Sequence, residues 1–188
     1  CFSSFAIIDA FWAIRMKEGS LSILGLCQRI IISSGSLVIT SPTVKMVSDI
    51  MRIKLKKDLN SYFKSLFSNL VAMLLLLILV IFTFRNLIAT IIIRDDITII
   101  GARLVETLVY MLPGMAFMLL SVVATRALYC FPENSSKLSL GGMSWAILYF
   151  ILSMILVPLN TIGTAIAYST SWLIYLSFCI VLLRKQLI

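Results

Sequence analysis

Long apolar runs separated by short polar segments dominate the sequence. They cover residues 20–43, 65–84, 98–125, 138–157 and 161–183, and each reaches the length of about 20 residues that a helix needs to cross a bilayer. Residues 1–14 form a shorter run, which we interpret as a partial span. Short links with turn residues, such as 15–20, 130–137 and 157–160, indicate antiparallel neighbours. The pattern predicts an all-α membrane bundle, a single domain with about five full spans and one partial span.

A basic segment lies between the second and third runs, at residues 44–64. Here Arg52, Lys54, Lys56 and Lys57 alternate with apolar residues, which is typical of a helix lying on an anionic lipid surface. The positive-inside rule alone would also place such residues beside a span on the cytoplasmic side. Basic residues gather again in 126–137 and near the C-terminus, so we expect these three segments to be cytoplasmic.

The amino-acid composition is that of a membrane protein rather than a soluble domain. The chain is 61% hydrophobic and only 13% charged, whereas soluble domains average about 25% charged residues. The net charge of +8 is compatible with nucleic acid or anionic lipid, but the basic residues flank apolar runs and form no aromatic-rich basic motif. We therefore expect anionic membrane lipid as a partner and no nucleic acid. Because the chain opens on Cys1, we expect it to be part of a longer protein.

Arg29 lies inside an apolar run, where an unpaired arginine facing lipid costs at least ~2.5 kcal/mol. The residues one helical turn away are Gly25, Leu26, Ile32 and Ser33, so its own helix offers no carboxylate. Two interpretations remain open: Asp9 on the preceding run neutralises Arg29, or Arg29 faces a cavity and binds an anion. Arginine suits the second role because its planar fork grips phosphate oxygens in bidentate fashion and stays charged.

Two further charges lie near a membrane boundary. Arg103 and Glu106 are three residues apart, so they share a helix face and form either a structural ion pair or a gate. An enzyme acting on a lipid phosphate would need an acid–base pair or a metal site. The chain has no histidine, and its four cysteines form no C-x-x-C pair. We expect a protein that is not an enzyme and holds no metal or cofactor.

Three stretches resemble the MurJ-type lipid II flippases, also called MviN. Residues 5–30, FAIIDAFWAIRMKEGSLSILGLCQRI, are similar to the family's membrane aspartate, glycine-containing turn and Ala-Asp-Arg motif. Residues 124–143 and 160–186 resemble a later loop with an Ala-x-Tyr segment and the span that follows it. The order of spans is similar to helices seven to twelve, the C-terminal lobe of this fourteen-helix family.

The resemblance implies one lobe of an alternating-access transporter of the multidrug/oligosaccharidyl-lipid/polysaccharide exporter superfamily. Its substrate would be a polyprenyl-pyrophosphate-linked glycan, with the peptidoglycan precursor lipid II as first candidate, and its location the bacterial inner (cytoplasmic) membrane. On this resemblance Arg29 falls on the pyrophosphate-binding arginine and Asp9 on the membrane aspartate, and the other lobe is the missing partner. Cys27-Gln28 replaces the family's Ala-Asp. A polysaccharide or O-antigen exporter, a drug/cation antiporter and a non-transporting scaffold remain alternatives.

Overall fold

The described part of the structure, a computed structural model, comprises residues 4–53, 56–92 and 100–187. It contains six α-helices and two short 3-10 helices and, within these ranges, no strand. The α-helices are α1 (Ser4–Ala13), α2 (Ser20–Arg52), α3 (Lys56–Ile92), α4 (Ile100–Tyr129), α5 (Ser135–Leu156) and α6 (Asn160–Leu187), and the 3-10 helices are Pro132–Asn134 and Val157–Leu159. The predicted all-α class is confirmed.

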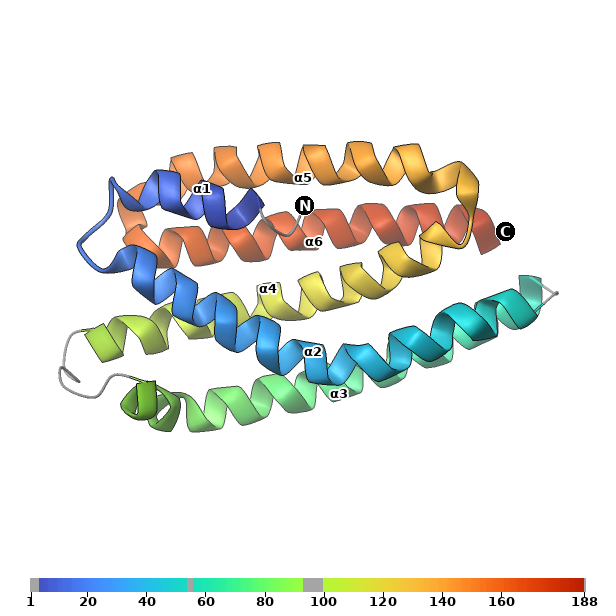
Figure 1. The fold of residues 1–188 in the computed structure, drawn as a ribbon, viewed down its shortest axis with the longest axis horizontal. Coiled ribbons are helices and arrows are strands. Elements are labelled where there is room, and N and C mark those ends of the chain that lie inside the picture. Colours follow the sequence, from blue (N-terminus) through green and yellow to red (C-terminus); the bar gives the residue numbers. More distant parts are fainter. Residues whose placement is uncertain (1–3, 54–55, 93–99, 188) are drawn as a thin grey trace.

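Four helical stretches are long and apolar enough to cross a membrane: 20–52, 58–92, 100–129 and 135–186. The last stretch holds both α5 and α6, which run antiparallel on either side of the 3-10 helix Val157–Leu159 (Figure 1). Each of these two helices, with 22 and 28 residues, is itself long enough to span the hydrocarbon core. The chain is a multi-pass membrane protein.

The reversal between α5 and α6 depends on two residues of the link. Asn160 adopts a φ of 55° with a ψ of −138°, which lies outside the left-handed helical region where asparagine is enriched. Three residues later, a Cβ added to Gly163 would lie 1.9 Å from the carbonyl oxygen of Leu156. Only glycine fits there, and the small residue allows the start of α6 to pack directly on the end of α5.

The helix α4 forms the centre of the bundle and packs against α2, α3 and α6. In its most apolar window 61% of the residues are buried, against 17% for α3. Leu75, Leu76 and Leu79 on α3 are among the exposed large hydrophobic residues. The helix α3 therefore presents a broad apolar surface of the kind that meets lipid.

The prediction of a separate interfacial helix over 44–64 is wrong. The helix α2 continues to Arg52, α3 begins at Lys56, and the two pack as a hairpin in which the Tyr62 hydroxyl donates to the Asp49 carboxylate at 3.0 Å. At 33 and 37 residues both exceed the length of about 20 needed to cross a bilayer. Arg52 is exposed at the end of α2.

For three of the basic residues predicted to face lipid, the structure does not describe the surroundings of the side chain. Lys54 lies outside the described residues, and only the backbone is described for Lys56 and Lys57. The end of α2, the link between α4 and α5 and the C-terminus lie together at one end of the bundle (Figure 1). This arrangement matches the common side that the distribution of basic residues predicts.

Candidate functional site

One side of α2 carries a run of exposed polar residues, interspersed with the exposed apolar residues Leu37 and Val44. We call it the polar face of α2; its members are Ser22, Arg29, Ser33, Ser36, Thr40, Ser41, Lys45 and Ser48. From Arg29 to Thr40 they recur every three or four residues, which is the helical period. An exposed polar stripe on a membrane-spanning helix indicates that this side faces water or another polar surface rather than lipid.

The opposite side of α2 is apolar and packs into the bundle. Ile23, Leu24 and Ile31 are buried there, and the Cys27 thiol donates a hydrogen bond to the Leu104 carbonyl of α4 at 3.7 Å. Pro42 lies inside α2, where a proline removes a backbone donor and bends the helix. Figure 1 shows α2 changing direction along its course. The packed side anchors α2 on α4 and leaves the polar face open.

Three hydroxyl groups of the polar face, those of Ser36, Thr40 and Ser48, donate to backbone carbonyls of α2. Ser36 donates to the Ser33 carbonyl at 2.8 Å, and Thr40 donates to the Ser36 carbonyl at 2.6 Å. Their oxygen lone pairs remain available, so these groups can accept hydrogen bonds from hydroxyl or amide groups of a ligand. Arg29 has the complementary character, because a guanidinium only donates.

A groove of about 310 Å³ lies between α2 and α4 beside the polar face. Ser36, Thr40 and Thr43 line it from α2, and Val122 and Arg126 line it from α4. Arg126 is exposed in the last turn of α4. From the sequence, Arg126 indicated only which side of the membrane is cytoplasmic, because the positive-inside rule places basic residues after an apolar run on that side.

Arg29 is exposed, and no ion pair to it occurs within residues 4–53, 56–92 and 100–187. The interpretation in which Asp9 neutralises Arg29 is wrong. Asp9 instead accepts hydrogen bonds from the Gln28 amide and the Tyr149 hydroxyl. Successive side chains on a helix point about 100° apart, so Gln28 faces α1 while Arg29 projects away from it.

The Asp9 carboxylate ties three helices together. It comes from α1 and is only 2% exposed, and its two donors come from α2 and α5. The Tyr149 ring also stacks on Trp145, at 5.7 Å between centroids. An aspartate in place of Gln28 would direct a second carboxylate at Asp9, so a neutral amide suits this packing.

The predicted pairing of Arg103 with Glu106 does not form. Both belong to the described part of α4, where Arg103 is half-buried and Glu106 is exposed, and no ion pair joins them. Exposed side chains gain little from such a contact because solvent screens the charges and holding two long side chains costs entropy. Neither residue lines the groove between α2 and α4.

Arg126 of α4 thus shares the α2–α4 groove with Ser36 and Thr40, while Arg29 lies further along the polar face of α2 and does not line the groove. Such a surface can bind an anionic group flanked by hydrogen-bonding groups. No protein-family model, curated protein or solved structure matches the chain.

Proposed function

We propose that this chain is one lobe of a transporter for an anionic, lipid-linked glycan, and that the polar face of α2 lines its translocation cavity. The substrate class is a polyprenyl pyrophosphate carrying a sugar head group, with lipid II as the first candidate. The observation that carries the proposal is the exposed Arg29, set on a stripe of hydroxyl groups inside a membrane-spanning helix. Facing lipid, that charge would cost at least ~2.5 kcal/mol; in a wet cavity it would not.

Each part of the substrate has a counterpart in the chemistry of the face. The Arg29 guanidinium would grip pyrophosphate oxygens in bidentate fashion. The hydroxyl oxygens of Ser36 and Thr40, whose protons already bond backbone carbonyls, would accept from sugar hydroxyl and amide groups. Arg126, which lines the same groove, would supply a second cation. The polyprenyl tail would stay in lipid.

Transport by this surface requires no bond to be made or broken. The polar face of α2 would form one wall, a second lobe would form the other, and the two would rock so that the cavity opens to each side of the membrane in turn. The membrane would be the bacterial cytoplasmic membrane, with the ends of α2, α4 and α6 in the cytoplasm, as the basic residues at those ends indicate.

The charges on the polar face of α2 also bear on the alternative functions. A polysaccharide or O-antigen exporter would use an identical phosphate contact, so only the substrate distinguishes it. A drug/cation antiporter needs carboxylates for its cationic substrate, whereas the polar face of α2 as defined carries Arg29 and Lys45. A non-transporting scaffold would tolerate neutralisation of Arg29.

The test is translocation of fluorescent lipid II by the full-length protein in proteoliposomes. Arg29→Ala removes a charge-assisted contact of about 1.5–3 kcal/mol, so we expect transport at limiting substrate to fall roughly 10- to 100-fold. Arg29→Lys keeps the charge but loses the bidentate grip, and should fall between wild type and Arg29→Ala.

The matched control is Arg85→Ala. Arg85 lies on α3, where its guanidinium covers the Phe82 ring and donates to the Phe82 carbonyl, and this variant should transport like wild type. If Arg29→Ala transports as well as wild type, the proposed phosphate contact is refuted. If the wild-type protein moves no lipid II, this substrate is wrong and other polyprenyl-linked glycans are next.

A further inference from the structure

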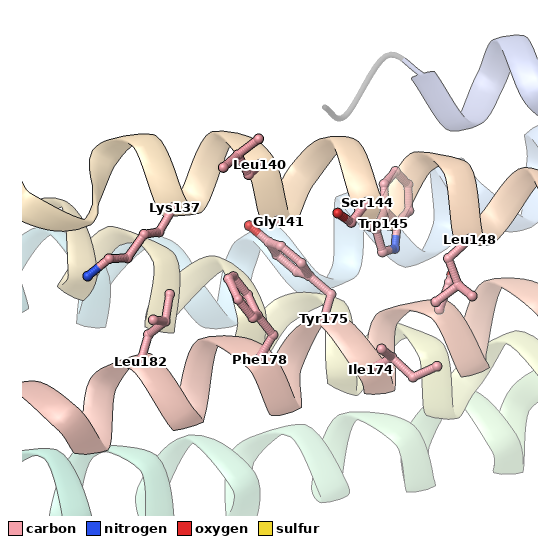
Figure 2. A pocket seen from close by; sticks show the side chains of 11 residues that line it. Lys137, Leu140, Gly141, Ser144, Trp145, Leu148, Ile174, Tyr175, Phe178 and Leu182 are labelled. Carbon is pink, nitrogen blue, oxygen red and sulfur yellow. The ribbon is translucent and has the colours of Figure 1, made fainter.

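A second groove, of about 350 Å³, runs between α5 and α6 (Figure 2). Its walls are mainly apolar and aromatic and include Trp145 and Leu148 of α5 and Tyr175 and Phe178 of α6. Its dimensions suit a small ligand site. The polar face of α2 contributes none of its lining residues, so the groove belongs to a different part of the surface.

The groove extends along both helices from one end of the bundle. Lys137, in the first turn of α5, and Leu182, near the end of α6, lie at one end, while Leu148 and Ile174 lie at the other (Figure 2). A Cβ on Gly141 would lie 2.5 Å from the Phe178 ring. The glycine thus lets the Phe178 ring lie close against α5 and shapes the middle of the groove.

The surface around the groove is apolar. Leu140 is 65% exposed and Ile147 59% on α5, while Ile174 is 49% exposed and Val181 52% on α6. In a multi-pass membrane protein such a surface meets hydrocarbon, and a groove in it is filled by hydrocarbon chains rather than by water.

The charge at the groove is concentrated at one end. Lys137 is exposed, and among the described residues that line the groove it is the only charged one. Arg184 and Lys185, in the last turn of α6, add positive charge at the same end of the bundle. A basic residue at the rim of an apolar channel is complementary to an amphiphile with an anionic head and a hydrocarbon tail.

We propose that the α5–α6 groove binds one phospholipid with an anionic headgroup, whose phosphate contacts Lys137 and one of whose acyl chains lies along Trp145, Tyr175 and Phe178. The inference is independent of the transport proposal, because it concerns another face of the molecule and requires no translocation. The bound lipid would fill the space between α5 and α6 and hold the two helices in register at the basic end.

Trp145 provides a local probe because it lines the groove, and the 188-residue sequence contains only two other tryptophans, Trp12 and Trp172. In the full-length protein, Trp12→Phe and Trp172→Phe together leave Trp145 as the only tryptophan of the described region. The fluorescence of Trp145 is then titrated with phosphatidylglycerol or phosphatidylcholine that carries bromine on its acyl chains, in nanodiscs of otherwise unbrominated lipid. Bromine quenches only a tryptophan that it contacts.

We expect half-maximal quenching at roughly fivefold less brominated phosphatidylglycerol than phosphatidylcholine, the ratio that corresponds to ~1 kcal/mol for one lysine at an anionic surface. Lys137→Gln should abolish this preference and retain quenching by both lipids. The matched control is Lys64→Gln, an exposed lysine of α3 that should keep it. Ser144→Phe, which places a ring in the groove, should reduce quenching by either lipid.

Equal quenching by the two lipids, or a preference that survives Lys137→Gln, would overturn the proposed headgroup contact. Absence of quenching by both lipids would overturn the site altogether, because it would mean that protein covers the groove. If the double tryptophan substitution impairs folding, native mass spectrometry of the otherwise unaltered protein gives the same decision. There, bound phosphatidylglycerol should decline in Lys137→Gln and not in Lys64→Gln.

Discussion

Replacement of Gly114 by alanine should strongly destabilise the protein, because α4 and α6 touch closely at this residue. Gly114 follows Pro113 within α4. Its backbone N–H donates to the Ser169 hydroxyl of α6 at 3.1 Å, and that hydroxyl donates to the Tyr110 carbonyl at 2.9 Å. Ser169 thus bridges the two backbone groups of α4 that a regular helix would pair directly.

A methyl group at residue 114 has no room. The added Cβ would lie 2.6 Å from the Tyr168 ring, 2.7 Å from the Ser169 hydroxyl and 2.9 Å from the Ser169 Cα. The last contact is to backbone, so relief requires α6 to move. Overpacking costs about 1–3 kcal/mol, and separation of the Ser169 bridge adds about 0.5–1.5 kcal/mol per hydrogen bond. We expect a total loss of roughly 2–6 kcal/mol for overpacking and the two hydrogen bonds together, a large part of a typical stability of 5–15 kcal/mol.

Gly25→Ala is the matched control. It is the same chemical change in a membrane-spanning helix, but no heavy atom lies within 4 Å of the added Cβ. Alanine also favours the helix over glycine by up to ~1 kcal/mol, so stability should stay equal or rise. Reversible unfolding in mixed micelles, followed by circular dichroism, measures both free energies. Equal stabilities for Gly114→Ala and Gly25→Ala would refute the assignment of close α4–α6 contact at Gly114.

Other substitutions test the remaining contacts. Tyr149→Phe removes one donor to the buried Asp9 carboxylate and should lower the free energy of unfolding by ~1–3 kcal/mol. The control Tyr110→Phe, at an exposed ring, should leave the free energy of unfolding unchanged. Equal losses in the two variants would contradict the hydrogen bond from Tyr149 to Asp9. Gly163→Ala directs a Cβ at the Leu156 carbonyl and should abolish the monodisperse fraction in gel filtration. A normal elution profile would show that the link between α5 and α6 can relax.

The number, type and approximate position of the long apolar helices were predictable, because a helix that crosses the bilayer needs a continuous apolar run of about 20 residues. The runs at 138–157 and 161–183 correspond to α5 at Ser135–Leu156 and α6 at Asn160–Leu187. The end of α2 was not predictable from the same pattern. Its polar face mixes serine, threonine and lysine with apolar residues, and that mixture equally describes an interfacial helix and a spanning helix with one wet side.

The candidate site was predictable only in part. Arg29 stands out in the sequence because a charge interrupts an apolar run, and its exposure agrees with an open, unneutralised side chain. The hydrogen-bond partners of Asp9 could not be predicted from the sequence. Its donor Tyr149 lies 140 residues away along the chain, and a tyrosine within an apolar run does not indicate which residue it will contact. The place of Arg126 beside the α2–α4 groove likewise depends on how helices pack.

The central claim, that the polar face of α2 lines a water-filled substrate cavity, is tested most directly by thiol accessibility. In the full-length protein with its native cysteines replaced, Ser36→Cys on the polar face is compared with Leu79→Cys on α3, where Leu79 is 60% exposed on the apolar surface. A charged thiol reagent reacts only with a thiol that water reaches. We predict rapid labelling at residue 36, slowed by a lipid-linked pyrophosphate, and no labelling at residue 79. Equal, slow labelling at both residues would contradict the account, because the polar face would then be buried in lipid or protein.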